Sequence, residues 1–150
     1  MDKRLIDAPA EARETIRGII ERCVYGLLAT VGVDGRSPKV RPVCAFLEDD
    51  FSILIPTHAR TRKIQEIERN PRVELCFVDD RHWQVRFAGE VSIEHDTAVK
   101  KRLIETTLDR RLWRGFFPGE ERDESFVLYR FIPESCEWMK EWELDYRRVV

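Results

Sequence analysis

The chain has 150 residues, 43% of them hydrophobic, which fits one globular domain with a buried core. Its 26 basic and 28 acidic side chains leave a formal charge of −2, which excludes a protein whose overall field attracts nucleic acid or an anionic membrane. No run of eighteen apolar residues and no Pro/Gly/Ser-rich linker occurs in the sequence. We therefore expect a single domain over residues 1–150 and a cytoplasmic location.

Neither a metal site nor a redox-active cysteine pair is indicated. The cysteines are widely spaced and include no Cys-x-x-Cys pair: Cys23, Cys44, Cys76 and Cys136. His82 and His95 have no second His or Cys at ligand spacing. We predict reduced core thiols and no metal.

The first predicted element is an amphipathic helix over residues 7–23. Asp7 is its expected N-cap, Pro9 lies in its first turn, and apolar residues follow at helical spacing from Ile16. Three predicted strands come next, over residues 24–33, 37–46 and 51–55, and the first two are joined by an Asp34-Gly35 hairpin turn. We expect these three strands to be antiparallel neighbours.

The second half of the chain predicts more strands with two further helices. A helix over residues 61–69 ends at Asn70-Pro71, because proline disfavours helical geometry in the residue before it. Residues 73–78 form a predicted strand, and residues 84–94 alternate apolar and polar side chains. Asp96 caps a helix from residue 97 to about 112, residues 116–119 start a loop, and residues 126–132 and 136–144 form two closing strands.

Consecutive strands with few helical crossovers favour a closed or half-closed barrel over a doubly wound parallel sheet. The predicted fold is mainly β with peripheral α: a barrel of about six to seven antiparallel strands with three helices.

The residues from Thr57 to Lys63 form a basic, hydroxyl-rich turn between a strand and a helix. The first N–H groups of a helix lack internal partners and lie at the positive end of its dipole, so Arg60, Arg62 and Lys63 indicate a phosphate site there. The alternative is a solvated basic helix start. Strand alternation places Arg41 on one face with Lys39 and Val43, from which it can leave the core and meet the basic turn, or pair with a surface acid.

Five motifs resemble the pyridoxamine 5′-phosphate oxidase-like superfamily, the FMN-binding split barrels, and in particular its short general-stress-protein-like members. They are PKVRPV at residues 38–43, IPT at 55–57, TRK at 61–63, NPRVEL at 70–75 and QVRFAG at 84–89. The resemblance covers roughly residues 15–95, and the order and spacing of the motifs are more specific than any one of them.

The resemblance implies a split barrel, a homodimer and an FMN cofactor at the subunit interface. On the matching positions, Arg41, Thr61, Arg62 and Lys63 would hold the phosphate. The flavin would lie along Thr57 and the backbone of Pro42, Val43 and Cys44, and Gln84 would reach the isoalloxazine ring. Gln84 begins a strand, so an ordinary surface glutamine is the alternative.

The resemblance implies a small FMN-dependent oxidoreductase with an unidentified substrate. Oxidation of pyridoxamine phosphate is not expected, because the Trp- and Arg/His-bearing C-terminal segment of such oxidases is absent and Phe46 stands where they carry a substrate-binding lysine. Two alternatives stay open: a non-catalytic flavin-binding stress or sensor protein, and a split barrel that binds haem or a deazaflavin. No catalytic side chain can be named, since FMN itself would transfer the electrons.

Overall fold

A computed structural model describes residues 4–107 and 123–150. The described chain contains a 3-10 turn, three helices and eight strands, in the order Leu5–Asp7, α1 (Ala10–Glu21), β1 (Gly26–Val31), β2 (Pro38–Val43), β3 (Phe46–Leu47), β4 (Ile53–His58), α2 (Arg62–Arg69), β5 (Arg72–Val78), β6 (Gln84–Ile93), α3 (Thr97–Thr106), β7 (Phe126–Met139) and β8 (Arg147–Arg148).

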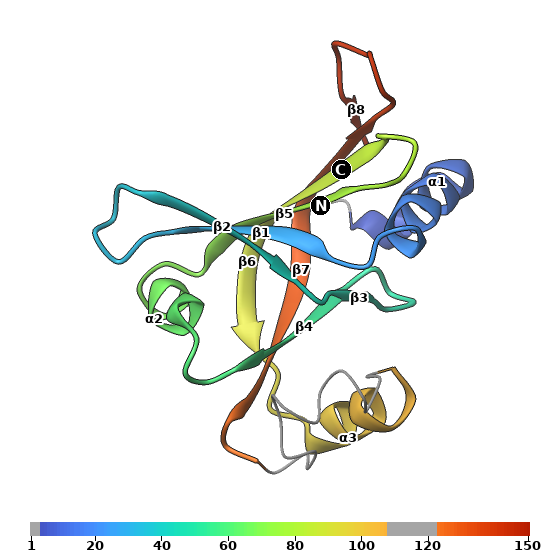
Figure 1. Cartoon of the computed structure of the whole chain (residues 1–150). Helices are drawn as coiled ribbons and strands as arrows, with labels where there is room; N and C mark the ends of the chain where they lie inside the picture. The colour runs from blue at the N-terminus through green and yellow to red at the C-terminus, as the bar shows by residue number, and fades with distance from the viewer. Residues whose placement is uncertain (1–3, 108–122) are drawn as a thin grey trace.

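All strand pairs of the described chain are antiparallel and belong to one curled sheet (Figure 1). The strand order is β2-β1-β5-β6-β7-β4-β3, and β8 pairs with β7. β2 and β4 are not paired with each other, so the barrel is split between them. The predicted split β-barrel is confirmed.

The expected pairing of the third predicted strand with the second holds only at Phe46, which pairs with Leu54, and was wrong for the rest of the second strand. Residues Ile53–His58 form β4, which pairs with β7 over its whole length and with the two-residue β3. The apolar run also continues as a strand beyond Pro56 to His58. Local sequence could not indicate this pairing, because β7 lies about seventy residues further along the chain.

The two predicted closing strands are a single strand, β7, which runs from Phe126 to Met139. Pro133 lies within it, opposite Gly89, where the register between β6 and β7 shifts. A proline cannot donate a ladder hydrogen bond, but the ladder is interrupted beside Pro133, because the next residue, Glu134, is the extra residue of the bulge. The backbone of Glu134 also approaches within 3.1 Å of where a Cβ of Gly89 would stand, so glycine fits this crossing.

The helices differ from the prediction mainly at their ends. Leu5–Asp7 is a 3-10 turn and α1 begins at Ala10 with Pro9 at its N-cap, so Asp7 does not cap it. Asp96 caps α3 as predicted, accepting a hydrogen bond from the Ala98 N–H at 2.8 Å. The expected last turn of this helix, residues 108–112, and the loop at 116–119 lie outside the described residues.

The core lies on the concave face of the sheet and is closed at one end by α1. Ile16 and Ile19 of α1 are completely buried, as are Leu28, Leu75 and Phe87 of three adjacent strands. Alternate residues of β1, β2 and β5 face outward on the convex side, where Leu27, Val40 and Val78 are exposed by 43, 69 and 47%. We call this convex side of the sheet, with its exposed apolar residues, the outer face.

Candidate functional site

The basic turn lies at the end of β4 and the start of α2. Thr57 is buried, and its hydroxyl lies 3.2 Å from the Thr61 hydroxyl. The Thr61 hydroxyl donates to the His58 carbonyl at 2.9 Å and makes no capping bond to α2. The start of this helix therefore has no side-chain cap.

The first turn of α2 contains Arg62 and Lys63 and no acidic residue. Positive side chains at the N-terminus of a helix oppose its dipole. Arg62 is exposed, whereas Lys63 is half-buried. Burial lowers the pKa of the Lys63 ammonium, and the neighbouring charge of Arg41 lowers it further. The charge of Glu66 acts in the opposite direction but does not cancel these two effects, so the pKa of Lys63 stays below its usual value.

Arg41 reaches the same place from β2, on the inner side of the sheet. Its Nη1 donates to the Thr30 hydroxyl at 2.6 Å and its Nη2 to the Glu66 carboxylate at 2.5 Å. Arg41 pairs in register with the buried Leu28, so it does not leave the core face as expected. The acid that it meets is also no surface acid, since Glu66 is only 4% exposed.

Glu66 is the carboxylate around which Arg41, Arg62 and Lys63 gather, and these three cations are hereafter the basic cluster. The Thr30 hydroxyl donates to its Oε2 at 2.6 Å, the oxygen that also accepts from Arg41. Burial alone would raise the pKa of the Glu66 carboxyl, but the hydrogen bond from Thr30 and the charge of Arg41 outweigh it and hold the pKa below its usual value. One carboxylate thus lies among three cations, Arg41, Arg62 and Lys63, and two positive charges remain.

The strand residues expected along a flavin lie at the edge of the split. Within β2, Pro42 is exposed and Val43 is buried, and Cys44 follows the strand with its side chain half-buried. β2 is an edge strand, so half of its backbone N–H and C=O groups have no strand partner. Burial raises the pKa of the Cys44 thiol, which disfavours a reactive thiolate there.

Gln84 is not brought to the basic cluster within one chain. The register places Arg41 in one row with Leu28, Leu75 and Phe87. Gln84 is three residues from Phe87 along β6, and therefore on the opposite face of the sheet. Three strand spacings also separate β2 from β6, roughly 14 Å. Gln84 belongs to the outer face.

Sequence reasoning missed Glu66 and Thr30. The available signal was that Glu66 follows Lys63 by three residues, which places both side chains on one face of α2. Thr30 gave no signal, because only the pairing of β1 with β2 brings its hydroxyl under Arg41.

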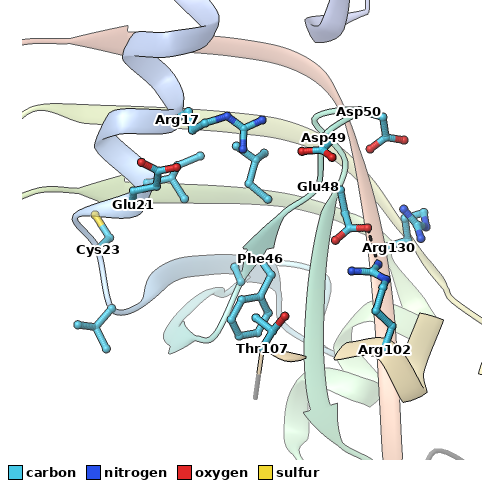
Figure 2. Close-up of a pocket in the computed structure, with 14 residues that line it drawn as sticks. Arg17, Glu21, Cys23, Phe46, Glu48, Asp49, Asp50, Arg102, Thr107 and Arg130 are labelled. Carbon is cyan, nitrogen blue, oxygen red and sulfur yellow. Dashed lines mark hydrogen bonds and ion pairs between the residues drawn. The ribbon is translucent and has the colours of Figure 1, made fainter. Parts of the chain in front are cut away.

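A separate cavity of about 820 Å³ opens between α1, the β3 segment and α3 (Figure 2). Phe46 forms part of its wall, and Arg102 crosses it to pair with Glu48 at 2.6 Å. None of the residues predicted to bind FMN lines it. Across residues 4–107 and 123–150, no group of three or more potential metal ligands occurs, and no helix is both long and apolar enough to cross a membrane.

The buried pair predicts a pH-dependent contribution of Glu66 to stability. Its pKa is lowered in the folded state, so its contribution is present above about pH 4.5, the ordinary value, and is lost as the pH falls through the lower, folded-state pKa. We expect Glu66→Gln to lower the free energy of unfolding by roughly 2–4 kcal/mol at pH 7, because it leaves Arg41 unpaired.

Urea unfolding between pH 3 and pH 7 measures this difference, which should shrink at the acid end. Glu68→Gln, on the exposed side of the same helix, is the matched control and should change stability by less than about 0.5 kcal/mol. An equal, pH-independent loss in both variants would contradict the assigned pairing.

Comparison with known proteins identifies the family and the fold. General stress protein 26 of Bacillus subtilis (strain 168) is 26% identical over 137 residues, which cover 89% of this chain and 91% of that protein. A pyridoxamine 5′-phosphate oxidase-related, FMN-binding protein of Nostoc punctiforme has the same fold, with a TM-score of 0.72 at 19% identity over 93% of this chain and 89% of that one.

A haem-binding protein of Mycobacterium smegmatis also shares the fold, with a TM-score of 0.71 at 15% identity over 93% of this chain and 58% of that one. The fold alone therefore accommodates different cofactors. The sequence model of the pyridoxamine 5′-phosphate oxidase family matches residues 12–140, which is most of the chain. The protein belongs to the pyridoxamine 5′-phosphate oxidase family, within the superfamily of split barrels that the sequence motifs indicated.

Proposed function

We propose that this protein is a homodimeric FMN-binding flavoprotein that acts as a small flavin-dependent oxidoreductase. The observation that carries the proposal is the half-buried Lys63, which lies beside Arg41 at the uncapped start of α2. Like charges are held together there without enough negative charge to balance them. A phosphate group supplies that charge.

The charges and donors of the cluster fit the phosphate of a mononucleotide. A phosphate monoester carries about −1.5 to −2 at pH 7, which balances the two positive charges that remain after Glu66 is counted. Arg62, Lys63 and the free N–H groups of α2 donate to its oxygens, and Arg41, kept in place by Glu66, completes the positive wall.

Bound FMN would supply the electron-transfer chemistry, and the chain's own residues would bind and orient it. In this arrangement the edge of β2, at Pro42, Val43 and Cys44, offers backbone groups to the ring system. Thr57, whose hydroxyl lies beside that of Thr61, would line the same site. Gln84 donates a hydrogen bond to the ring from a second copy of the chain.

A second copy is required because Gln84 and the basic cluster lie on opposite faces of the sheet. The outer face that contains Gln84 also exposes Leu27, Val40 and Val78, an apolar patch of the kind that subunit interfaces bury. An isologous dimer built on this face places β6 of one copy near the split of the other. Each FMN would then be shared between two chains.

The phosphate assignment predicts that Arg62→Ala combined with Lys63→Ala weakens FMN binding by about 100-fold or more, since each charge-assisted hydrogen bond contributes about 1.5–3 kcal/mol. Riboflavin, which lacks the phosphate, should lose less than about threefold. Fluorescence titration of both ligands measures the ratio.

Arg69→Ala removes a cation from the other end of α2 and serves as the matched control, with little effect on either ligand. Equal losses of FMN and riboflavin in the double variant would show that the basic turn does not hold the phosphate.

The shared site predicts that Leu27→Lys, which puts a charge on the outer face, converts a dimer into a monomer and lowers FMN affinity at the same time. Light scattering and flavin titration on the same sample test this. Leu144→Lys, at a residue that is 95% exposed, should leave both properties unchanged. A wild-type monomer that holds FMN at micromolar concentration would refute the shared site.

Turnover separates an enzyme from a carrier or sensor. We expect NADH or NADPH to reduce the bound flavin, and oxygen or a dye to reoxidise it, which absorbance at the flavin band follows directly. A flavin that neither nucleotide reduces would instead identify a non-catalytic flavin binder.

A further inference from the structure

The side-chain amide of Gln84 is held in one orientation by two neighbours on the outer face. Its Oε1 accepts a hydrogen bond from the Tyr146 hydroxyl at 2.9 Å. The same oxygen accepts from Nε and Nη2 of Arg86, both at 3.3 Å. Three donors from two different parts of the chain thus converge on one oxygen of a half-buried side chain.

This convergence decides which way the amide points. A guanidinium group has only donors, so the atom of Gln84 that faces Arg86 must be the carbonyl oxygen and not the nitrogen. The Nε2 group therefore points the other way. Among the residues that the structure describes, no acceptor bonds to it. Its two hydrogens are available to an outside group.

Both neighbours are themselves held in place. Arg86 donates from Nη1 to Glu74 at 3.1 Å, and its guanidinium lies 5.4 Å from the centre of the Tyr146 ring. Tyr146 belongs to the segment that turns back after β7 and is followed directly by β8, which pairs with Glu137 and Trp138. The C-terminal segment thereby places the Tyr146 hydroxyl beside Gln84, more than sixty residues earlier in the chain.

We propose that Tyr146 and Arg86 are positioning residues that lock the Gln84 amide with Nε2 toward the outer face, where it donates to a carbonyl oxygen of the flavin ring of the second copy. This inference rests on the proposed function, since it assigns a task to Gln84 in the shared site. A flavin ring gains electron density when it is reduced, and a fixed donor stabilises that density. The lock therefore raises the reduction potential of bound FMN.

The first test needs no flavin. In the ¹⁵N-labelled free protein, the Gln84 side-chain amide should show a high order parameter by NMR relaxation, because three hydrogen bonds restrain it. Tyr146→Phe removes the hydroxyl and keeps the ring over Arg86, so this order parameter should fall while the fold stays intact. Tyr129→Phe removes a different tyrosine hydroxyl, buried in β7, and should leave the Gln84 amide unchanged.

The second test uses the FMN-loaded dimer and measures the reduction potential of the bound flavin. Tyr146→Phe should shift it downward, and Tyr129→Phe should not. Gln84→Glu should shift it further downward, because a carboxylate still accepts from Arg86 and Tyr146 but presents an oxygen in place of the Nε2 donor. Rescue in Gln84→Asn is not expected, since the shorter side chain cannot span both neighbours.

An unchanged order parameter of the Gln84 amide in Tyr146→Phe would overturn the positioning role of Tyr146, independently of any result with flavin. A lower order parameter with an unchanged potential would overturn the assignment of Nε2 to the flavin ring. If the wild-type protein does not bind FMN at all, the proposed function fails and the ring contact with it, whereas the order parameter still decides whether Tyr146 positions Gln84.

Discussion

The physical constraint on which this structure depends is the crowding of positive charge in the split of the barrel. The charge of Arg41 acts on Lys63, which lies in the first turn of a helix whose start has no side-chain cap and whose dipole is also positive there. A single buried carboxylate, Glu66, with the Thr30 hydroxyl, keeps Arg41 in place but does not neutralise the group. Such an arrangement destabilises the folded chain, so its presence indicates a functional role.

The topology explains why this cluster forms where it does. β2 and β4 approach each other without pairing, so their edges leave backbone groups and side chains available at the split. α2 begins directly after β4 and brings its N-terminus to the same opening. The long β7 strand holds β4 from the other side, and Gly89 and Pro133 let β6 follow its curvature. One edge of β4 is thus held by β7, whereas its other edge is not paired with β2.

Much of the local structure could be predicted, because it depends on neighbouring residues. The Asp34-Gly35 turn places Gly35 at a φ of 71°, the Asp96 side chain caps α3, and Asn70-Pro71 ends α2. These features follow from turn, capping and proline geometry. A closed or half-closed barrel could also be inferred from hairpin-joined strands with few helices, and the family resemblance implied that it is split.

The predictions that were wrong or missing concern contacts between segments that are distant in the sequence. The pairing of β4 with β7 joins strands that are separated in the described chain by α2, β5, β6 and α3. The continuity of β7 through Pro133 depends on a bulge shared with β6. For the same reason, sequence placed Arg41 and Gln84 near one ligand without showing that they lie on opposite faces of the sheet. The burial of Glu66, which holds Arg41 in place, could not be predicted either, because it follows from tertiary packing.

The fold is shared by proteins described as FMN-binding and as haem-binding, so the barrel alone does not determine the ligand. We propose that in this chain the charge cluster does. Mass spectrometry of the gently purified protein under non-denaturing conditions tests that claim most directly. The account predicts two chains with two bound FMN molecules, each released with its phosphate on denaturation. A dimer that instead releases haem, or a flavin without a phosphate, would contradict it.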